Sequence, residues 1–203
     1  EIYQKVVSVL REICEEEEFK ELIKEGGEVE AFTISRSEAY LEERKPEDLA
    51  RLILTNFRFQ KAIREGKARV KVLVENIETQ REHLTGISVA GLEGDISMDD
   101  VLESLRDFLP GFQRKYDKLF ITPDGVLVIR LEITDENGNP LKEEMVPLLE
   151  RHLRARLARR RVKKLVGLKT GSELFGRVLV PKLLQEAEKT GIPQIYILPE
   201  RIT

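Results

Sequence analysis

The residue types that most often do chemistry are scarce in this chain and lie far apart in it. Cys14 is its one thiol, and His83 and His152 are its two imidazoles, among 203 residues. A zinc cage or a catalytic thiol–imidazole pair needs several such groups at set spacings. We therefore expect no catalytic residue and no metal site. Cys14 is predicted to be a buried structural thiol, and both histidines are predicted to lie at the surface.

Sequence fingerprints for nucleotide binding and acyl transfer are also missing. The chain has no Gly-x-Gly-x-x-Gly after a strand pattern, no Gly-x-x-x-x-Gly-Lys phosphate loop and no Gly-x-Ser-x-Gly elbow. The glycine-flanked segment 167–171 has its lysine in the wrong place for a phosphate loop. We therefore expect these residues to bind no cofactor.

Acidic residues gather where a helix is predicted to begin. Ser97-x-x-Asp100 fits a capping pair, and the acids beside it suit the positive end of a helix. The same place offers backbone N–H groups that could bind the carboxylate of an amino acid, while Asp or Glu takes its ammonium group. The candidate ligand-binding loop consists of Leu92, Glu93, Gly94, Asp95, Ile96 and Ser97.

A basic segment lies further along. Residues 151–170 contain nine Lys and Arg and no acid, whereas residues 1–50 contain 15 acidic and 7 basic residues. A basic helix can bind phosphate, an acidic partner or the acidic region of its own assembly, or it can be a solvated face. The net charge of −3 and the absence of interleaved aromatic residues disfavour nucleic acid. The candidate anion- or partner-binding residues are Arg154, Arg156, Arg159, Arg160, Arg161, Lys163 and Lys164.

Helical patterns dominate the first 66 residues. Hydrophobic spacing predicts a helix over 1–24, a short helix after Ser35 or Ser37, and a longer helix from Pro46 that Gly66 ends. Residues 28–34 alternate weakly and predict a short strand or an extended link. Together these elements form a predicted helical subdomain, residues 1–66.

Period-two patterns begin at residue 68. Helices are predicted to start at Ser97 and near Pro147, and residues 165–193 give no clear pattern; the strand candidates are 68–75, 86–91, 114–121, 126–134 and 194–198. The order from residue 86 is then βαββαβ, the ferredoxin-like arrangement, with 68–75 at an edge and two helices on one sheet face. The predicted fold class is α+β, with a helical subdomain (1–66) followed by a ferredoxin-like domain (67–203).

Two short motifs in residues 41–76 carry a family resemblance. They are Arg44-Lys45-Pro46-Glu47-Asp48-Leu49, and Gly66-Lys67-Ala68-Arg69-Val70-Lys71-Val72 with Glu75-Asn76 after it. This run resembles a stretch near the N-terminus of the large NAD-dependent glutamate dehydrogenases, which continues into an ACT-like regulatory domain. Residues 87–90, 95–98 and 128–133 are similar to the strand, acidic turn and later strand of that domain. Ile77 stands where the family has proline, and the proline of the acidic turn is absent.

The resemblance implies a non-catalytic N-terminal regulatory or assembly fragment of a larger NAD-dependent amino acid dehydrogenase. It implies an ACT-like fold, an amino acid ligand at residues 92–97, and partners in the rest of the parent polypeptide and in a homo-oligomer. The start at Glu1, the lack of a signal pattern and the lack of a long apolar run lead us to expect a cytoplasmic piece of a longer chain with no membrane contact. The alternatives are a ferredoxin-like nucleic-acid-binding module that uses residues 151–164, and a purely structural oligomerisation domain.

Overall fold

The computed structural model describes the backbone of residues 1–168 and the side chains of residues 1–159. The chain divides into two compact units, Glu1–Arg159 and Arg160–Thr203. The first unit contains every element that precedes the final helix, together with the first part of that helix. None of the helices within residues 1–168 combines the length and the apolar character needed to cross a bilayer.

Five helices precede the sheet: α1 (Ile2–Ile13), α2 (Glu16–Ile23), α3 (Glu28–Ile34), α4 (Glu38–Glu42) and α5 (Pro46–Arg64). Ser37 caps α4, because its hydroxyl accepts a hydrogen bond from the Tyr40 N–H at 3.2 Å. Pro46 occupies the first turn of α5, as predicted. The predicted short helix after Ser37 and the predicted long helix from Pro46 are therefore confirmed.

Two predictions for the N-terminal region are wrong. The helix predicted over 1–24 is broken at Cys14, whose extended backbone ends α1. The acidic run that follows forms the first turn of α2, where negative side chains suit the positive end of a helix. Residues 28–34 are helical, because Val29 and Phe32, three residues apart, are both buried on one helix face.

The second half of the unit is a four-stranded antiparallel sheet with the order β1-β2-β4-β3. Its strands are β1 (Val70–Glu78), β2 (His83–Leu92), β3 (Gln113–Ile121) and β4 (Val126–Thr134). Helix α6 (Met98–Phe108) connects β2 to β3, and a short 3-10 turn (Glu143–Met145) leads from β4 into α7 (Val146–Leu168). Helices followed by such a sheet confirm the predicted α+β class.

β1 lies at an edge of the sheet, as predicted for residues 68–75, but it takes the place that the predicted order gives to a closing strand. β2, α6, β3 and β4 form the split unit of a ferredoxin-like arrangement. β1 pairs beside β2, in the edge position that a βαββαβ order gives to a closing strand. Over residues 70–168 the observed order is thus ββαββα, and β1, which precedes the split unit, supplies the fourth strand. The strand predicted at 194–198, and most of the unclear segment 165–193, lie outside the described residues.

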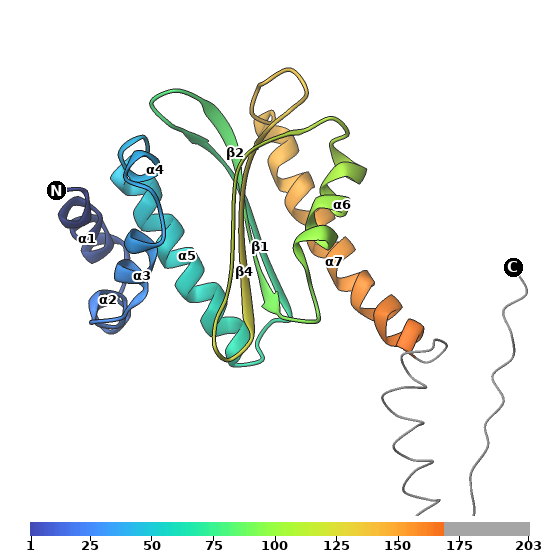
Figure 1. Ribbon diagram of the computed structural model, residues 1–203, viewed down its shortest axis with the longest axis horizontal. Coiled ribbons are helices and arrows are strands. Elements are labelled where there is room, and N and C mark those ends of the chain that lie inside the picture. Colours follow the sequence, from blue (N-terminus) through green and yellow to red (C-terminus); the bar gives the residue numbers. More distant parts are fainter. Residues whose placement is uncertain (169–203) are drawn as a thin grey trace, which may run out of the picture. The chain divides into compact units, whose positions relative to one another are not determined.

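Both faces of the sheet are covered, so the prediction of a single covered face is wrong. Helices α6 and α7 lie on one face (Figure 1). Helix α5 lies on the other face, where the ends of α3 and α4 also contact the sheet, and α1 and α2 lie beyond α5. Every position of β4 is buried as a result. The predicted boundary at residues 66 and 67 falls between α5 and β1, which belong to the same compact unit.

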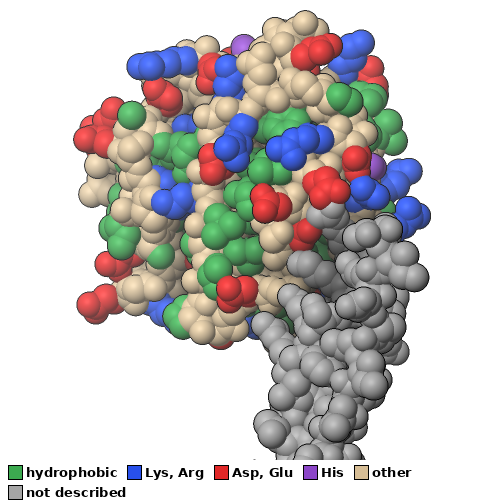
Figure 2. Space-filling model, turned by 45° about the vertical axis from the view of Figure 1, so that its right-hand side comes forward, with side chains coloured by type: hydrophobic (Ala, Val, Ile, Leu, Met, Phe, Trp, Pro, Cys, Tyr) green, Lys and Arg blue, Asp and Glu red, His purple; other side chains and the backbone are tan. Residues whose placement is uncertain are grey.

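The two apolar layers differ in size. The layer under α6 and α7 is the larger and includes Ile87, Val89, Ile129 and Leu131 of the central strands. The layer under α5 is small, where Ile63 packs with three strand residues, Ala90, Val126 and Val128. On the face drawn in Figure 2, charged side chains of both signs are interspersed with apolar ones.

Candidate functional site

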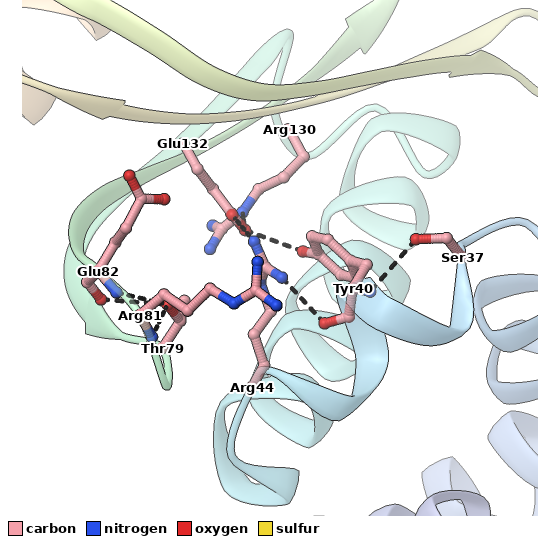
Figure 3. A network of polar contacts seen from close by, with 8 residues as sticks. All are labelled: Ser37, Tyr40, Arg44, Thr79, Arg81, Glu82, Arg130 and Glu132. Carbon is pink, nitrogen blue, oxygen red and sulfur yellow. Dashed lines mark hydrogen bonds and ion pairs between the residues drawn. The ribbon is translucent and has the colours of Figure 1, made fainter.

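A buried ion network joins the N-terminal helices to the sheet (Figure 3). Glu132 on β4 is 0% exposed, and Arg130 on the same strand face is 3% exposed. Arg44, just after α4, donates to one carboxylate oxygen of Glu132, and the Tyr40 hydroxyl donates to the other at 2.8 Å. Arg130 lies 3.3 Å from that second oxygen and donates to the Ser88 hydroxyl at 3.0 Å. Glu132 thus receives hydrogen bonds from both helix and strand.

The charge states of this network follow from its surroundings. Burial alone would raise the pKa of Glu132, but Arg130 and Arg44 outweigh that effect and hold the pKa below its ordinary value. Burial and the neighbouring carboxylate raise the pKa of Tyr40. At neutral pH Glu132 is therefore ionised and Tyr40 is protonated. This arrangement ties the fold together, and neither group is poised to exchange a proton with a substrate.

The hairpin between β1 and β2 also contacts the end of α4. The backbone N–H of Gln80 donates to the Glu43 carbonyl at 2.9 Å, and its side-chain amide donates to the Glu42 carbonyl at 3.0 Å. Arg81 lies 3.2 Å from the Glu43 carboxylate. The Thr79 hydroxyl orders the turn by accepting the Glu82 N–H at 3.0 Å (Figure 3). The end of α4 is therefore bound both to the sheet face and to the hairpin.

The outer edge of β1 is covered by the segment that follows β4. The carboxylate of Glu150 on α7 accepts a hydrogen bond from the backbone N–H of Val74 at 3.1 Å. The side-chain amide of Asn76 donates to the Leu141 carbonyl at 2.8 Å and to the Glu143 carboxylate at 3.0 Å. The first contact occupies a backbone N–H that an added strand would need, and the others hold the segment after β4 beside the edge. Covering an edge in this way is one means by which natural proteins protect it.

The other edge strand, β3, has two different halves. Its first half contains a register shift between Arg114 and Tyr116 and carries several charges. A bulge and charged side chains both discourage pairing with another chain. From Tyr116 onward β3 pairs regularly with β4. There Leu119 is 40% exposed and Ile121 is 45% exposed.

Backbone groups of this regular half point away from the sheet. The Thr122 N–H donates to the Val126 carbonyl at 2.9 Å, which fixes the phase of the β3–β4 ladder. Because the ladder alternates residue by residue, the N–H and C=O groups of Leu119 and Ile121 point outward. Within the described residues, the second half of β3 is therefore an open edge with two exposed apolar side chains.

The predicted ligand-binding loop is a tight turn between β2 and α6 in which many donors are already used. The Glu93 N–H donates to the Gly125 carbonyl at 2.8 Å, and the Asp95 N–H donates to the Leu92 carbonyl at 3.0 Å. The Ser97 hydroxyl accepts the Asp100 N–H at 3.2 Å, which confirms the predicted cap. The structure brings all six predicted residues together, with Ile96 in the core, Leu92 exposed and Gly94 at a φ of 90°. Ligand binding at this turn stays a prediction.

The predicted basic residues of α7 are partly used within the protein. Arg154 donates to Glu150 at 2.8 Å, and Arg156 donates to Asp107 of α6. Arg159 is exposed. The side chains of the other four candidates lie outside the described part of the helix: Arg160, Arg161, Lys163 and Lys164.

The thiol and the imidazoles lie on different elements. Cys14 is half-buried at the end of α1, where its Sγ donates to the Leu10 carbonyl at 2.8 Å, so the thiol is less buried than predicted. Burial raises the pKa of the thiol, with Glu18 adding to the effect, which disfavours the reactive thiolate. His83 is exposed, as predicted.

His152 departs from the surface position predicted for it. It is half-buried, with its Nε2 at 2.9 Å from the Ser104 carbonyl oxygen and its ring packed beside Phe108. The histidine therefore links α7 to α6. Among the described residues, no group of three or more His, Cys, Asp and Glu side chains is placed to hold a metal ion.

Comparison with known proteins adds no relative: the chain matches no family model, no curated protein and no solved structure. A functional proposal must therefore rest on the geometry of the chain and on the motifs that carry the resemblance. The sequence did hold one signal for the buried network. Arg130 and Glu132 are opposite charges two residues apart inside an apolar strand, a spacing that places both on one face.

Proposed function

We propose that this chain is a non-catalytic assembly and regulatory module whose open β3 edge pairs with a second copy of itself. The observation that carries the proposal is the contrast between the two edges of the sheet. Glu150 covers the edge of β1, whereas Leu119 and Ile121 leave the regular half of β3 exposed. The resemblance to the ACT-like region of large NAD-dependent glutamate dehydrogenases supports the same role, with catalysis carried by other parts of a larger polypeptide.

The sequence of β3 is complementary to itself in one register. When two β3 strands pair antiparallel about a twofold axis at Leu119, that residue meets its own copy. Ile121 then lies opposite Asp117, and Lys118 lies opposite Phe120. No like charges face each other over this stretch. Registers centred on Asp117 or Lys118 would oppose identical charges.

Molar mass from light scattering after size exclusion tests the pairing. At about 100 µM protein we expect a dimer for the wild type and a monomer for Leu119→Lys, which would place two ammonium groups opposite each other. Ile13→Lys is the matched control, because Ile13 is about as exposed but lies on α1. It should remain dimeric. A monomeric wild type, or a dimeric Leu119→Lys, would contradict the proposal.

Regulation in this proposal works through linkage. An amino acid that binds one arrangement of the paired copies better than another shifts the population by that difference in affinity. The loop 92–97 is its proposed place, with the Glu93 carboxylate for the ammonium group. Calorimetric titration with the common amino acids should give heat with at least one, and Glu93→Gln should abolish it. If none of them gave heat, the regulatory part of the proposal would be contradicted, and the role of a purely structural oligomerisation domain would remain.

Nucleic-acid binding through α7 has weaker support. Arg154 and Arg156 direct their charges to Glu150 and Asp107 of the protein itself. Such binding would also fall steeply with salt. A filter-binding assay at low salt that retains no oligonucleotide would remove this alternative.

A further inference from the structure

A small cavity lies between α3 and β3, on the sheet face that the N-terminal helices cover. Its volume is about 210 Å³, room for roughly seven water molecules at their share of liquid volume. Phe32 of α3 and Phe120 of β3 supply apolar walls, and the small side chain of Ala31 leaves the space between them. Two cations, Arg36 and Lys118, line the same cavity.

Arg36 is a buried cation that forms no ion pair with a carboxylate among residues 1–159. It is 9% exposed, and its Nε has no hydrogen-bond partner. The guanidinium donates to the Ser35 hydroxyl at 3.0 Å and to the Phe32 carbonyl at 3.4 Å, and it stacks 3.5 Å from the centre of the Phe32 ring. Arginine keeps its charge in such surroundings, so burial without a carboxylate at ion-pair distance carries a cost that a bound anion would offset.

Lys118 brings a second positive charge to the cavity. Its Nζ donates to the backbone carbonyl of Ser35 at 2.8 Å, so Ser35 holds both cations, one through its hydroxyl and one through its carbonyl. Lys118 also has no ion pair with a carboxylate within the described residues. Two cations from elements far apart in the sequence therefore converge on one residue at the cavity wall.

One acid lines the cavity, against two cations. Glu28 accepts a hydrogen bond from the Gln60 amide at 3.2 Å, and burial raises the pKa of its carboxyl. The cavity therefore carries a positive balance against apolar walls. Its chemistry fits an anion with an apolar body better than a purely hydrophobic or a cationic molecule.

We propose that this cavity binds a small carboxylic acid whose carboxylate lies between Arg36 and Lys118 and whose apolar body packs between Phe32 and Phe120. The guanidinium supplies the paired donors that match a carboxylate, and the ammonium adds a second charge-assisted bond. The volume limits the body to about one phenyl ring with a short chain. Lys118 and Phe120 project to the sheet face opposite to that of Leu119.

Titration of the ¹⁵N-labelled chain with 3-phenylpropanoate tests the site, with the Ala31, Phe32 and Ser35 amides as reporters. We expect saturable shifts with a Kd below about 1 mM. The uncharged 3-phenylpropanamide should bind at least about tenfold more weakly, because it cannot form the charge-assisted bonds.

Two variants carry the test, because Arg36 is buried and its replacement endangers the fold. Lys118→Gln removes one cation, and Ala31→Trp fills the cavity from an exposed position on α3. Each should weaken 3-phenylpropanoate at least about tenfold. Lys115→Gln, on the same strand but away from the cavity, should keep the wild-type affinity. No saturable shift up to about 10 mM, equal binding of the amide, or unchanged affinity in both variants would overturn the proposal.

Discussion

The guanidinium of Arg130 lies across the place where Gly86 has no side chain. A Cβ atom added to Gly86 would lie 2.4 Å from Nη2 and 2.7 Å from Cζ of Arg130. Gly86 on β2 is the register partner of Glu132 on β4, so the missing side chain gives the guanidinium room to reach both Glu132 and Ser88. The buried network therefore depends on a glycine as well as on its charged residues.

Gly86→Ala should lower the free energy of unfolding by about 3 kcal/mol, since the added methyl group forces Arg130 out of its contacts. Urea denaturation followed by circular dichroism measures this loss. In an Arg130→Met background the same substitution should cost less than about 1 kcal/mol, because the clashing guanidinium is gone. An equal cost in both backgrounds would show that Gly86 matters for another reason.

Acid should destabilise the protein through Glu132. Because the pKa of Glu132 is lowered in the folded state, its stabilising contribution is complete above the ordinary value of 4.5 and is lost as the pH falls through the folded value. The free energy of unfolding should therefore decrease from about pH 5 downward. Glu132→Gln should remove this part of the acid slope. At pH 7 it should cost about 3–5 kcal/mol, since Arg44 and Arg130 lose their shared counterion.

Urea titrations from neutral pH into acid check this expectation. Glu16→Gln is the control, because Glu16 pairs with Lys20 at an exposed site on α2. This variant should stay within about 0.5 kcal/mol of the wild type and keep its acid slope. If the free energy of unfolding of Glu132→Gln decreased in acid as steeply as that of the wild type, other carboxylates would be responsible for the acid sensitivity.

Glu150→Ala should expose the edge of β1. The Val74 N–H would lose its acceptor. The free energy of unfolding should therefore fall by about 1–2 kcal/mol. Native-state hydrogen exchange should become faster at Val74. Arg154→Ala is the matched control, because it removes the exposed ion pair of Glu150 but leaves the bond to Val74. Equal exchange rates at Val74 in Glu150→Ala and the wild type would mean that this contact does not protect the edge.

Features that depend on residues close together in the sequence could be predicted. The strand β4 and the cap at Ser97 depend on a clear alternation and on a side chain three residues from its partner, and both are confirmed. Residues 28–34 were predicted wrongly because seven residues are too few to separate a weak period of two from the helical spacing of Val29 and Phe32.

Features decided across the fold could not be predicted. Both β1 and residues 194–198 have the sequence pattern of a strand that could pair beside β2. The local pattern does not show which of the two takes that place. The polar face of β4 showed that Arg130 and Glu132 share a side, but not that α4 and Arg44 cover it. Likewise, Ser35 and Lys118 meet because α3 packs beside β3, and neither residue carries a motif.

Self-pairing of β3 at Leu119 is tested most directly by a disulfide cross-link. In a Cys14→Ser background, Leu119→Cys would place two thiols on facing residues about 5.5 Å apart between Cα atoms, within the range that a disulfide spans. We predict a covalent dimer on mild oxidation, seen on a non-reducing gel. Asp117→Cys should give none, since the register separates those two residues by about 13 Å. Failure of Leu119→Cys to cross-link, or equal cross-linking through Asp117→Cys, would contradict the proposed assembly.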